Sequence, residues 1–247
     1  HSAVHRGLKS TDRDDLWTWY DPAVRVPSVW GSGGDVDAIA QWTYAYPDPV
    51  RIAQATDELF AMAEGAQHPQ HVMKMTQLIW YRSQTAPKPG AGVPAPNRQA
   101  DWEKTDGDAD FITIAPDALR IAFWTKIARP VQGIMYHDWP SLVDTGRRGG
   151  YRFTHPGAQP ALAELTRTVI QPLGPTLLQV PDPPSDVGFL QSFASQMLAR
   201  RSSWGWSDDD VYLMLQYAHL QPRVLYEESV LRNGLDGLKM LVLSQCD

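Results

Sequence analysis

The chain has 247 residues, of which 43% are hydrophobic and 20% are charged, a composition typical of a soluble globular protein. Its formal net charge of −6 and its pI near 5.6 argue against nucleic acid as the main partner, because phosphate binding requires a basic surface. The single cysteine, Cys246, excludes an internal disulfide framework, and no apolar run approaches the roughly 20 residues that a membrane helix needs.

Both ends of the sequence differ from those expected of a complete protein. The chain begins at His1 with neither an initiator Met nor a signal-peptide pattern. It ends at Leu241–Asp247, at the close of a pattern typical of a buried strand. We therefore interpret the sequence as an internal fragment, in which case any segment that directs localisation lies outside it.

The first part of the chain alternates strand and helix patterns. Leu16–Tyr20 alternates aromatic and polar residues and predicts a short strand, and Asp37–Tyr46 predicts a second strand. The apolar residues of Val50–Glu64 repeat at helical spacing. His71–Tyr81 then predicts a third strand.

A long loop separates the third strand from the next helix. Ser83–Ala115 is rich in proline and predicts a loop, and loops of this length are usually functional or mobile. Pro116–Arg129 predicts a helix, Val131–Trp139 a strand, and Gln159–Gln171 another helix. The resulting order, β, β, α, β, α, β, α, predicts a parallel sheet that is either open or closed as a barrel.

A proline-rich linker over residues 172–186 predicts a domain boundary. Beyond it, Asp186–Phe193 predicts a strand, and a helix follows the capping-box pattern at Ser207. Arg223–Tyr226 and Lys239–Leu243 predict two more strands. This order, strand, helix, strand, turn or short helix, strand, is that of the first half of a flavodoxin-like doubly wound domain.

Chemically versatile residues follow both strands of the central βαβ unit, where parallel α/β folds bind ligands. Asp138 is the strongest candidate for a catalytic carboxylate, although it is also suited to capping the following turn. Glu103, in the long loop, is a second catalytic candidate, and a solvated loop residue is its simpler interpretation. The candidate substrate-binding residues are Tyr44, Tyr46, Asp48, Gln77, Trp80, Arg82, His137 and Trp139.

Each binding candidate also has a structural interpretation. Trp80 and Trp139 are suited to stacking on a sugar ring and equally to packing in the protein. His137 is suited to orienting Asp138 or to a satisfied buried position. Asp48, between two prolines, is also typical of a turn residue. If the candidates form one site, the ends of all three strands must open onto a single sugar-sized hollow.

The sequence does not favour a metal or a cofactor. His68 and His71 are separated by Pro69 and no helix supports their spacing, so they do not form the helical zinc motif. Cys246 is not in a nucleophile elbow and has no visible catalytic partner. We therefore expect neither a cofactor nor a metal site.

Four segments resemble the last strands of the barrel in β-galactosidase-type glycoside hydrolases. That family has a (β/α) barrel followed by a glutamine-amidotransferase-like trimerisation domain. The resemblance implies that residues 1–180 are the C-terminal half of a TIM barrel and residues 186–247 part of the second, flavodoxin-like domain. It also implies a homotrimer. The segments that carry it are Tyr44–Pro49, Met73–Gln77, Pro116–Arg120 and Gly133–Trp139.

The resemblance also locates the family's catalytic positions. It implies that the fifth to eighth barrel strands are residues 16–19, 38–44, 72–79 and 132–136. The general acid/base of the family comes from the fourth strand, which this chain lacks, and its nucleophile is a Glu at the end of the seventh. The nearest residue here is Gln77, whose neutral amide cannot form a good glycosyl ester.

These observations leave three hypotheses open. The first is a glycoside hydrolase that acts on an oligosaccharide or polysaccharide. The second is a non-catalytic carbohydrate-binding relative in which Gln77 has replaced the carboxylate. The third is an unrelated α/β protein whose fold only imitates the end of a barrel, because fold alone does not determine function.

Overall fold

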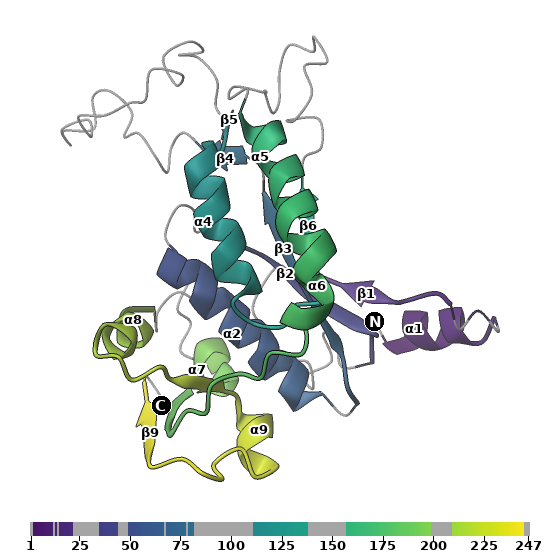
Figure 1. The fold of residues 1–247 in the computed structure, drawn as a ribbon. Coiled ribbons are helices and arrows are strands. Elements are labelled where there is room, and N and C mark those ends of the chain that lie inside the picture. Colours follow the sequence, from purple (N-terminus) through teal and green to yellow (C-terminus); the bar gives the residue numbers. More distant parts are fainter. Residues whose placement is uncertain are drawn as a thin grey trace, which may run out of the picture.

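Two parallel sheets organise the chain, and the long helix α2 (Pro49–Gly65) packs against both of them (Figure 1). The structure is a computed structural model. It describes residues 2–11, 13, 15–21, 35–43, 49–66, 68–77, 79–81, 111–137, 157–198 and 209–244.

The larger sheet has four parallel strands in the order β1-β2-β3-β6. The strands are β1 (Trp19–Tyr20), β2 (Ala38–Thr43), β3 (His71–Gln77) and β6 (Gly133–His137). The predicted parallel sheet is therefore confirmed, although β1 is shorter than the strand expected from Leu16. One reason is that the backbone N–H of Thr18 donates to the Asp37 carboxylate instead of a neighbouring strand.

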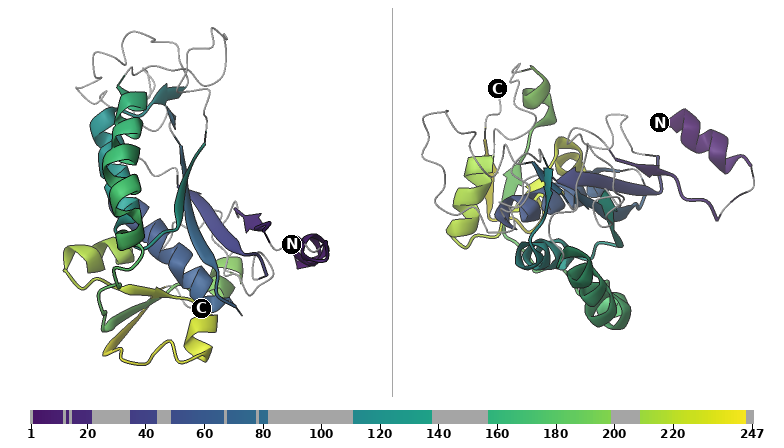
Figure 2. Two further views of the ribbon diagram at one scale, coloured as in Figure 1. Left: turned by 45° about the vertical axis from the view of Figure 1, so that its right-hand side comes forward. Right: turned by 90° about the horizontal axis from the view of Figure 1, so that it is seen from above.

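The helices that follow strands β2, β3 and β6 lie on one side of the sheet (Figure 2). They are α2, α4 (Pro116–Ile127) and a continuous run of α5 (Ala158–Leu165), the π-helix η4 (Thr166–Ile170) and α6 (Gln171–Leu177). Among the described helices, none is both long enough and apolar enough to span a bilayer.

The core lies between the sheet and these helices. Side chains alternate between the two faces of a strand, so Ile39 and Val72 face the helices together. There they pack in one cluster with Leu59 of α2 and Phe123 of α4. Met135, on the opposite face of β6, is 37% exposed. The sheet is thus buried on its helix-covered face and open at the β6 edge of the other.

Two strands form a separate antiparallel ribbon. β4 (Ile79–Tyr81) pairs with β5 (Phe111–Thr113) rather than with the parallel sheet. The single strand predicted over His71–Tyr81 is therefore wrong beyond Gln77. The end of the predicted loop is also corrected, because Phe111–Thr113 supplies the partner strand that β4 requires.

The predicted linker over residues 172–186 is too long, because the helix continues through its prolines to Leu177. The π-helix widens the turn before Pro172: the N–H of Gln171 bonds the carbonyl of Thr166, five residues earlier. Pro172 and Pro175 remove donors from α6, but none of its residues is buried, so water can reach the freed carbonyls.

The C-terminal sheet has three parallel strands in the order β8-β7-β9. Its strand β7 is shorter than predicted and is followed by the unpredicted helix α7. The elements are β7 (Val187–Leu190), α7 (Phe193–Leu198), α8 (Asp209–Tyr217), β8 (Arg223–Leu225), α9 (Glu227–Leu231) and β9 (Met240–Leu243). The predicted alternation of strands and helices is therefore present.

An additional helix, α1 (Ser2–Lys9), is tied to the start of β2 through Asp37. The Asp37 carboxylate accepts hydrogen bonds from the backbone and hydroxyl of Thr18 and lies 3.0 Å from the Lys9 ammonium. Partial burial alone would raise the pKa of Asp37, but Thr18 and Lys9 lower it to about 2. The charged carboxylate therefore anchors α1.

A polar cluster joins α2 to the C-terminal segments. The Tyr212 hydroxyl of α8 donates to the Asp57 carboxylate of α2 at 2.5 Å, and Arg129 donates to the same carboxylate at 3.3 Å. Arg129 also bonds Asp182 and lies 4.0 Å from the centre of the Phe60 ring. Burial raises the pKa of Asp57, and the nearby Arg129 and Tyr212 oppose that shift.

A second cluster lies further along the same interface. Gln191, at the end of β7, donates to the fully buried Glu58 at 2.8 Å. The Tyr226 hydroxyl in turn donates to Gln191 at 3.3 Å. These bonds give polar groups partners inside an otherwise apolar interface, where a group without a partner would cost about 1–3 kcal/mol.

Two lysines are buried inside the helix-covered layer. Lys74 of β3 and Lys126 of α4 are 0% and 1% exposed. Burial lowers the pKa of Lys126 to about 7. Among the described residues, no carboxylate forms an ion pair with it. Desolvation of Lys126 therefore opposes folding whenever the ammonium is charged.

Replacing Tyr212 by Phe removes one hydrogen bond and little volume. We expect Tyr212→Phe to lower the free energy of unfolding by about 1–3 kcal/mol, measured by urea denaturation, because a buried bond to a carboxylate is lost. Tyr217→Phe, on the same helix but 72% exposed, is the control and should leave stability unchanged. Equal stability of the two variants would contradict a role for this bond.

Lys126→Met should stabilise the protein in a pH-dependent way. The folded-state pKa lies below the unfolded value of 10.5, so the native protein binds fewer protons between about pH 7 and 10.5. Wild-type stability should therefore rise with pH across this window, and the burial penalty is fully present below it. We expect a gain of about 1–3 kcal/mol at pH 7 that shrinks towards pH 10.

Denaturation of both proteins at several pH values tests this expectation. Lys239→Met is the control, because Lys239 is exposed. A gain for Lys126→Met that does not change with pH would show that packing, and not titration, produces it.

Candidate functional site

The carboxyl edge of the larger sheet is the candidate site. In the parallel register, Thr43 of β2 lies opposite Thr76 of β3, and Gln77 lies opposite His137 of β6. All three strands therefore end at the same edge, where α/β folds bind their ligands. The pleat has a period of two residues, so position 77 shares a face with positions 73 and 75. The backbones of two predicted site residues, Gln77 and His137, are thus direct neighbours.

Most of the other predicted site residues lie outside the described residues. Trp80 is on β4, opposite Ile112 of β5, so its backbone has left the parallel sheet. The predicted residues that lie outside the described part are Tyr44, Tyr46, Asp48, Arg82, Glu103, Asp138 and Trp139.

The edge is free of the C-terminal sheet. Figure 1 shows β4 and β5 at one end of the molecule, and the C-terminal elements α8, α9 and β9 beneath α2 at the opposite end. Within the described residues, the interface around Asp57 and Arg129 therefore lies away from the candidate site and does not cover it.

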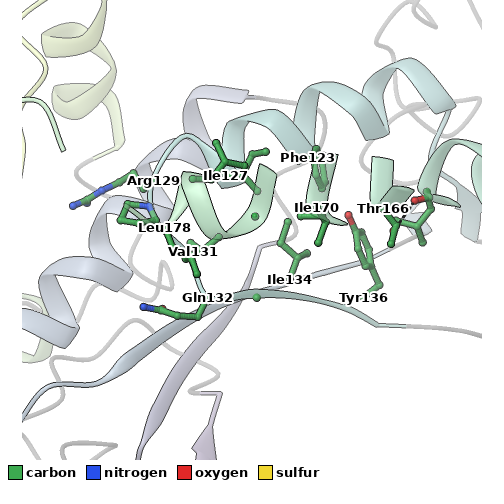
Figure 3. Close-up of a pocket in the computed structure, with 15 residues that line it drawn as sticks. Phe123, Ile127, Arg129, Val131, Gln132, Ile134, Tyr136, Thr166, Ile170 and Leu178 are labelled. Carbon is green, nitrogen blue, oxygen red and sulfur yellow. Dashed lines mark hydrogen bonds between the residues drawn. The ribbon is translucent and has the colours of Figure 1, made fainter. Parts of the chain in front are cut away.

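An apolar cavity of about 350 Å³ lies on the helix-covered face, between β6, α4 and the α5–η4–α6 run (Figure 3). Ile134 and Tyr136 of β6 form its floor, and Ile170 of η4 lies opposite them. The Tyr136 hydroxyl is buried, and burial raises its pKa, so it remains protonated. Alternation along β6 assigns Tyr136 to this face, but the cavity depends on helices far away in the sequence and was not predicted.

A second, more polar cleft of about 620 Å³ lies between α2 and the segments that precede β7, β8 and β9. Its charged groups already pair with each other: Arg129 binds Asp57 and Asp182, and Arg223 lies 2.9 Å from Glu64. The cleft also lies at the amino edge of its sheet, opposite to the edge where ligands usually bind.

The described residues contain no group of three metal-ligating side chains. Within this part, His71 stacks on Trp17 with ring centres 4.2 Å apart, and Nδ1 of His68 lies 3.2 Å from the carbonyl of Pro69. The two histidine side chains therefore contact different groups.

No protein-family model and no curated protein sequence matches this chain. Two solved structures are similar to it. The first is a β-galactosidase from the psychrophilic Marinomonas ef1, with a TM-score of 0.56 and 12% identity, covering 98% of this chain and 38% of that one. The second is a GH5_18 protein from Bifidobacterium longum subsp. infantis, with a TM-score of 0.43 and 13% identity, covering 85% of this chain and 48% of that one.

The chain thus spans less than half the length of either structure. At these identities the similarity concerns the fold alone, and only the β-galactosidase match is close enough to support an argument. This similarity extends over 98% of the chain, which includes the parallel strands β1, β2, β3 and β6. The chain therefore has a mixed α/β fold that is distantly similar to that of a glycoside hydrolase.

Proposed function

We propose that residues 1–180 are the C-terminal half of a glycosidase-like (β/α) barrel and residues 186–247 part of a glutamine-amidotransferase-like domain. The four parallel strands, covered by helices on one face, support the first assignment. The order β8-β7-β9 supports the second, because the first three strands of a flavodoxin-like sheet adopt the order 2-1-3.

The function that fits this fold best is hydrolysis of an oligosaccharide or polysaccharide. The observation that carries it is the pairing of Gln77 with His137 at the carboxyl edge of the sheet. Asp138 follows His137 directly in the sequence. In our proposal Asp138 supplies a catalytic carboxylate, Glu103 is a candidate for the second, and Gln77 and His137 bind sugar hydroxyls.

The proposed role of Asp138 is tested by Asp138→Asn. We expect a loss of about 10²–10⁴-fold in turnover of 4-nitrophenyl glycosides, including the β-galactoside, because an amide can neither donate nor accept the catalytic proton. Asp117→Asn is the matched control, since Asp117 is exposed at the start of α4, and it should retain full activity. Near-normal turnover by Asp138→Asn would reject the assignment.

The alternative function is carbohydrate binding without hydrolysis. The observation that favours it is Gln77 itself, because a neutral amide at the end of β3 is suited to hydrogen bonding and not to nucleophilic attack. In this case the same edge binds sugars, and the chain turns over none of the glycosides.

Gln77→Ala tests sugar binding at this edge, and turnover of glycosides by the wild-type chain distinguishes the hydrolase from the binder. A binder should lose about 3–10-fold in affinity for its best glycan, measured by calorimetry, because one hydrogen bond to the sugar is removed. Gln159→Ala, an exposed change on α5, should leave the affinity unchanged. If the wild-type chain neither hydrolyses nor binds any carbohydrate tested, both functions are rejected.

A further inference from the structure

The cavity beside β6 contains one polar group that the protein leaves without a partner. Three of its polar lining residues already make bonds. Arg129 binds two carboxylates, Gln132 accepts from the backbone N–H of Val72 at 2.6 Å, and the Thr166 hydroxyl donates to the Leu162 carbonyl. The buried hydroxyl of Tyr136, in contrast, has no hydrogen-bond partner among the described residues.

The position of this hydroxyl matters because the rest of the lining is mostly apolar. Figure 3 shows the Tyr136 ring against the cavity wall, with its hydroxyl pointing towards the helices on the side of Ile170. A buried hydroxyl without a partner destabilises the folded protein, and a bound molecule that accepts a hydrogen bond from it would remove this cost. The π-helix η4 lines the same cavity, and π-helical turns are frequent at functional sites.

These constraints define the chemistry of a ligand. It must be largely apolar to fit walls formed by Phe123, Ile134 and Ile170. It must offer a hydrogen-bond acceptor, because the Tyr136 hydroxyl donates. It must be neutral, because Arg129, the cation at the rim, is already paired with Asp57 and Asp182. A volume of about 350 Å³ suits a compact molecule at the small end of ligand pockets.

We propose that the cavity between β6, α4 and η4 binds a small neutral, mostly apolar molecule whose carbonyl, ether or hydroxyl oxygen accepts a hydrogen bond from Tyr136. This site does not depend on the proposed carbohydrate function, because it lies on the helix-covered face. It is nevertheless connected to the candidate site, since Tyr136 immediately precedes His137 on β6.

Two probes of the same shape test the proposal on the 247-residue chain. Acetophenone carries a carbonyl acceptor, and α-methylstyrene replaces that carbonyl by an apolar C=CH₂ group. Calorimetry should show both compounds binding, with acetophenone the tighter. Tyr136→Phe should weaken acetophenone binding by up to about tenfold and leave α-methylstyrene unchanged, because only one hydrogen bond is lost.

A blocking variant tests the location. Ile170→Trp should fill the cavity and abolish binding of both probes, and Thr166→Trp provides a second block from the same helical turn. Leu173→Trp is the matched control: Leu173 is 44% exposed, close to the 39% of Ile170, but does not line the cavity. This variant should bind both probes as the wild type does.

Three results would overturn the proposal. The first is that neither probe binds the folded wild-type chain. The second is that Tyr136→Phe leaves the affinity for acetophenone unchanged. The third is concentration-dependent self-association, seen by light scattering, that Ile170→Trp abolishes, which would show that a polypeptide and not a small molecule covers the cavity.

Discussion

The structure depends on the burial of α2 on two sides. Its Leu59 and Met62 lie in the core beneath the larger sheet, and the same cluster includes Phe189 and Val224 of the C-terminal sheet. A surface helix normally has one apolar stripe, but α2 must also present Asp57 and Glu58 to polar partners. Each of these carboxyl groups has a hydrogen-bond donor from a distant segment. The helix therefore holds the C-terminal sheet in place, and it also packs against β2 and β3, the strands that precede and follow it.

This arrangement determines which edge of the sheet remains open. α2 runs back from the carboxyl end of β2 to the amino end of β3, and the C-terminal elements lie beneath α2, at the opposite end of the molecule from β4 and β5 (Figure 1). In parallel α/β folds, the segments that follow the carboxyl ends of strands commonly carry the ligand-binding residues. The interface and the candidate site thus occupy opposite ends of the same layer. A mutation in the polar clusters around Asp57 and Glu58 should therefore change the free energy of unfolding more than it changes the carboxyl edge of the larger sheet.

Much of the local structure could be predicted from the sequence, because it depends on short-range patterns. The apolar spacing of α2 and α4 and the extended pattern of β3 gave elements within a few residues of those observed. The exceptions have long-range or unusual causes. β4 turns away because it finds a partner at Phe111–Thr113, and α6 tolerates Pro172 because a π-helical turn precedes it. Neither cause is visible in a window of ten residues.

The same distinction applies to the candidate site and its surroundings. Gln77 and His137 were predicted to meet because parallel strands end together, and the register confirms that their backbones do. The bond between Asp57 and Tyr212 joins residues 155 positions apart, so no local pattern could indicate it. Lys126 was unexpected for a different reason: it occupies an apolar position of α4, where burial of an ammonium opposes folding. Sequence patterns therefore predict which residues end the strands at the carboxyl edge. The contacts in the interior join residues that are far apart in the sequence, so they are seen only in the folded structure.

The two sides of β6 suggest how a cavity and a site edge can share one strand. Adjacent residues of a strand point to opposite faces, so Tyr136 faces the helices while position 137 belongs to the open face. A molecule bound to Tyr136 would therefore contact the strand that also carries His137, without occupying the carboxyl edge. β6, the strand that ends the parallel sheet, thus lines the apolar cavity with one face and ends at the candidate site.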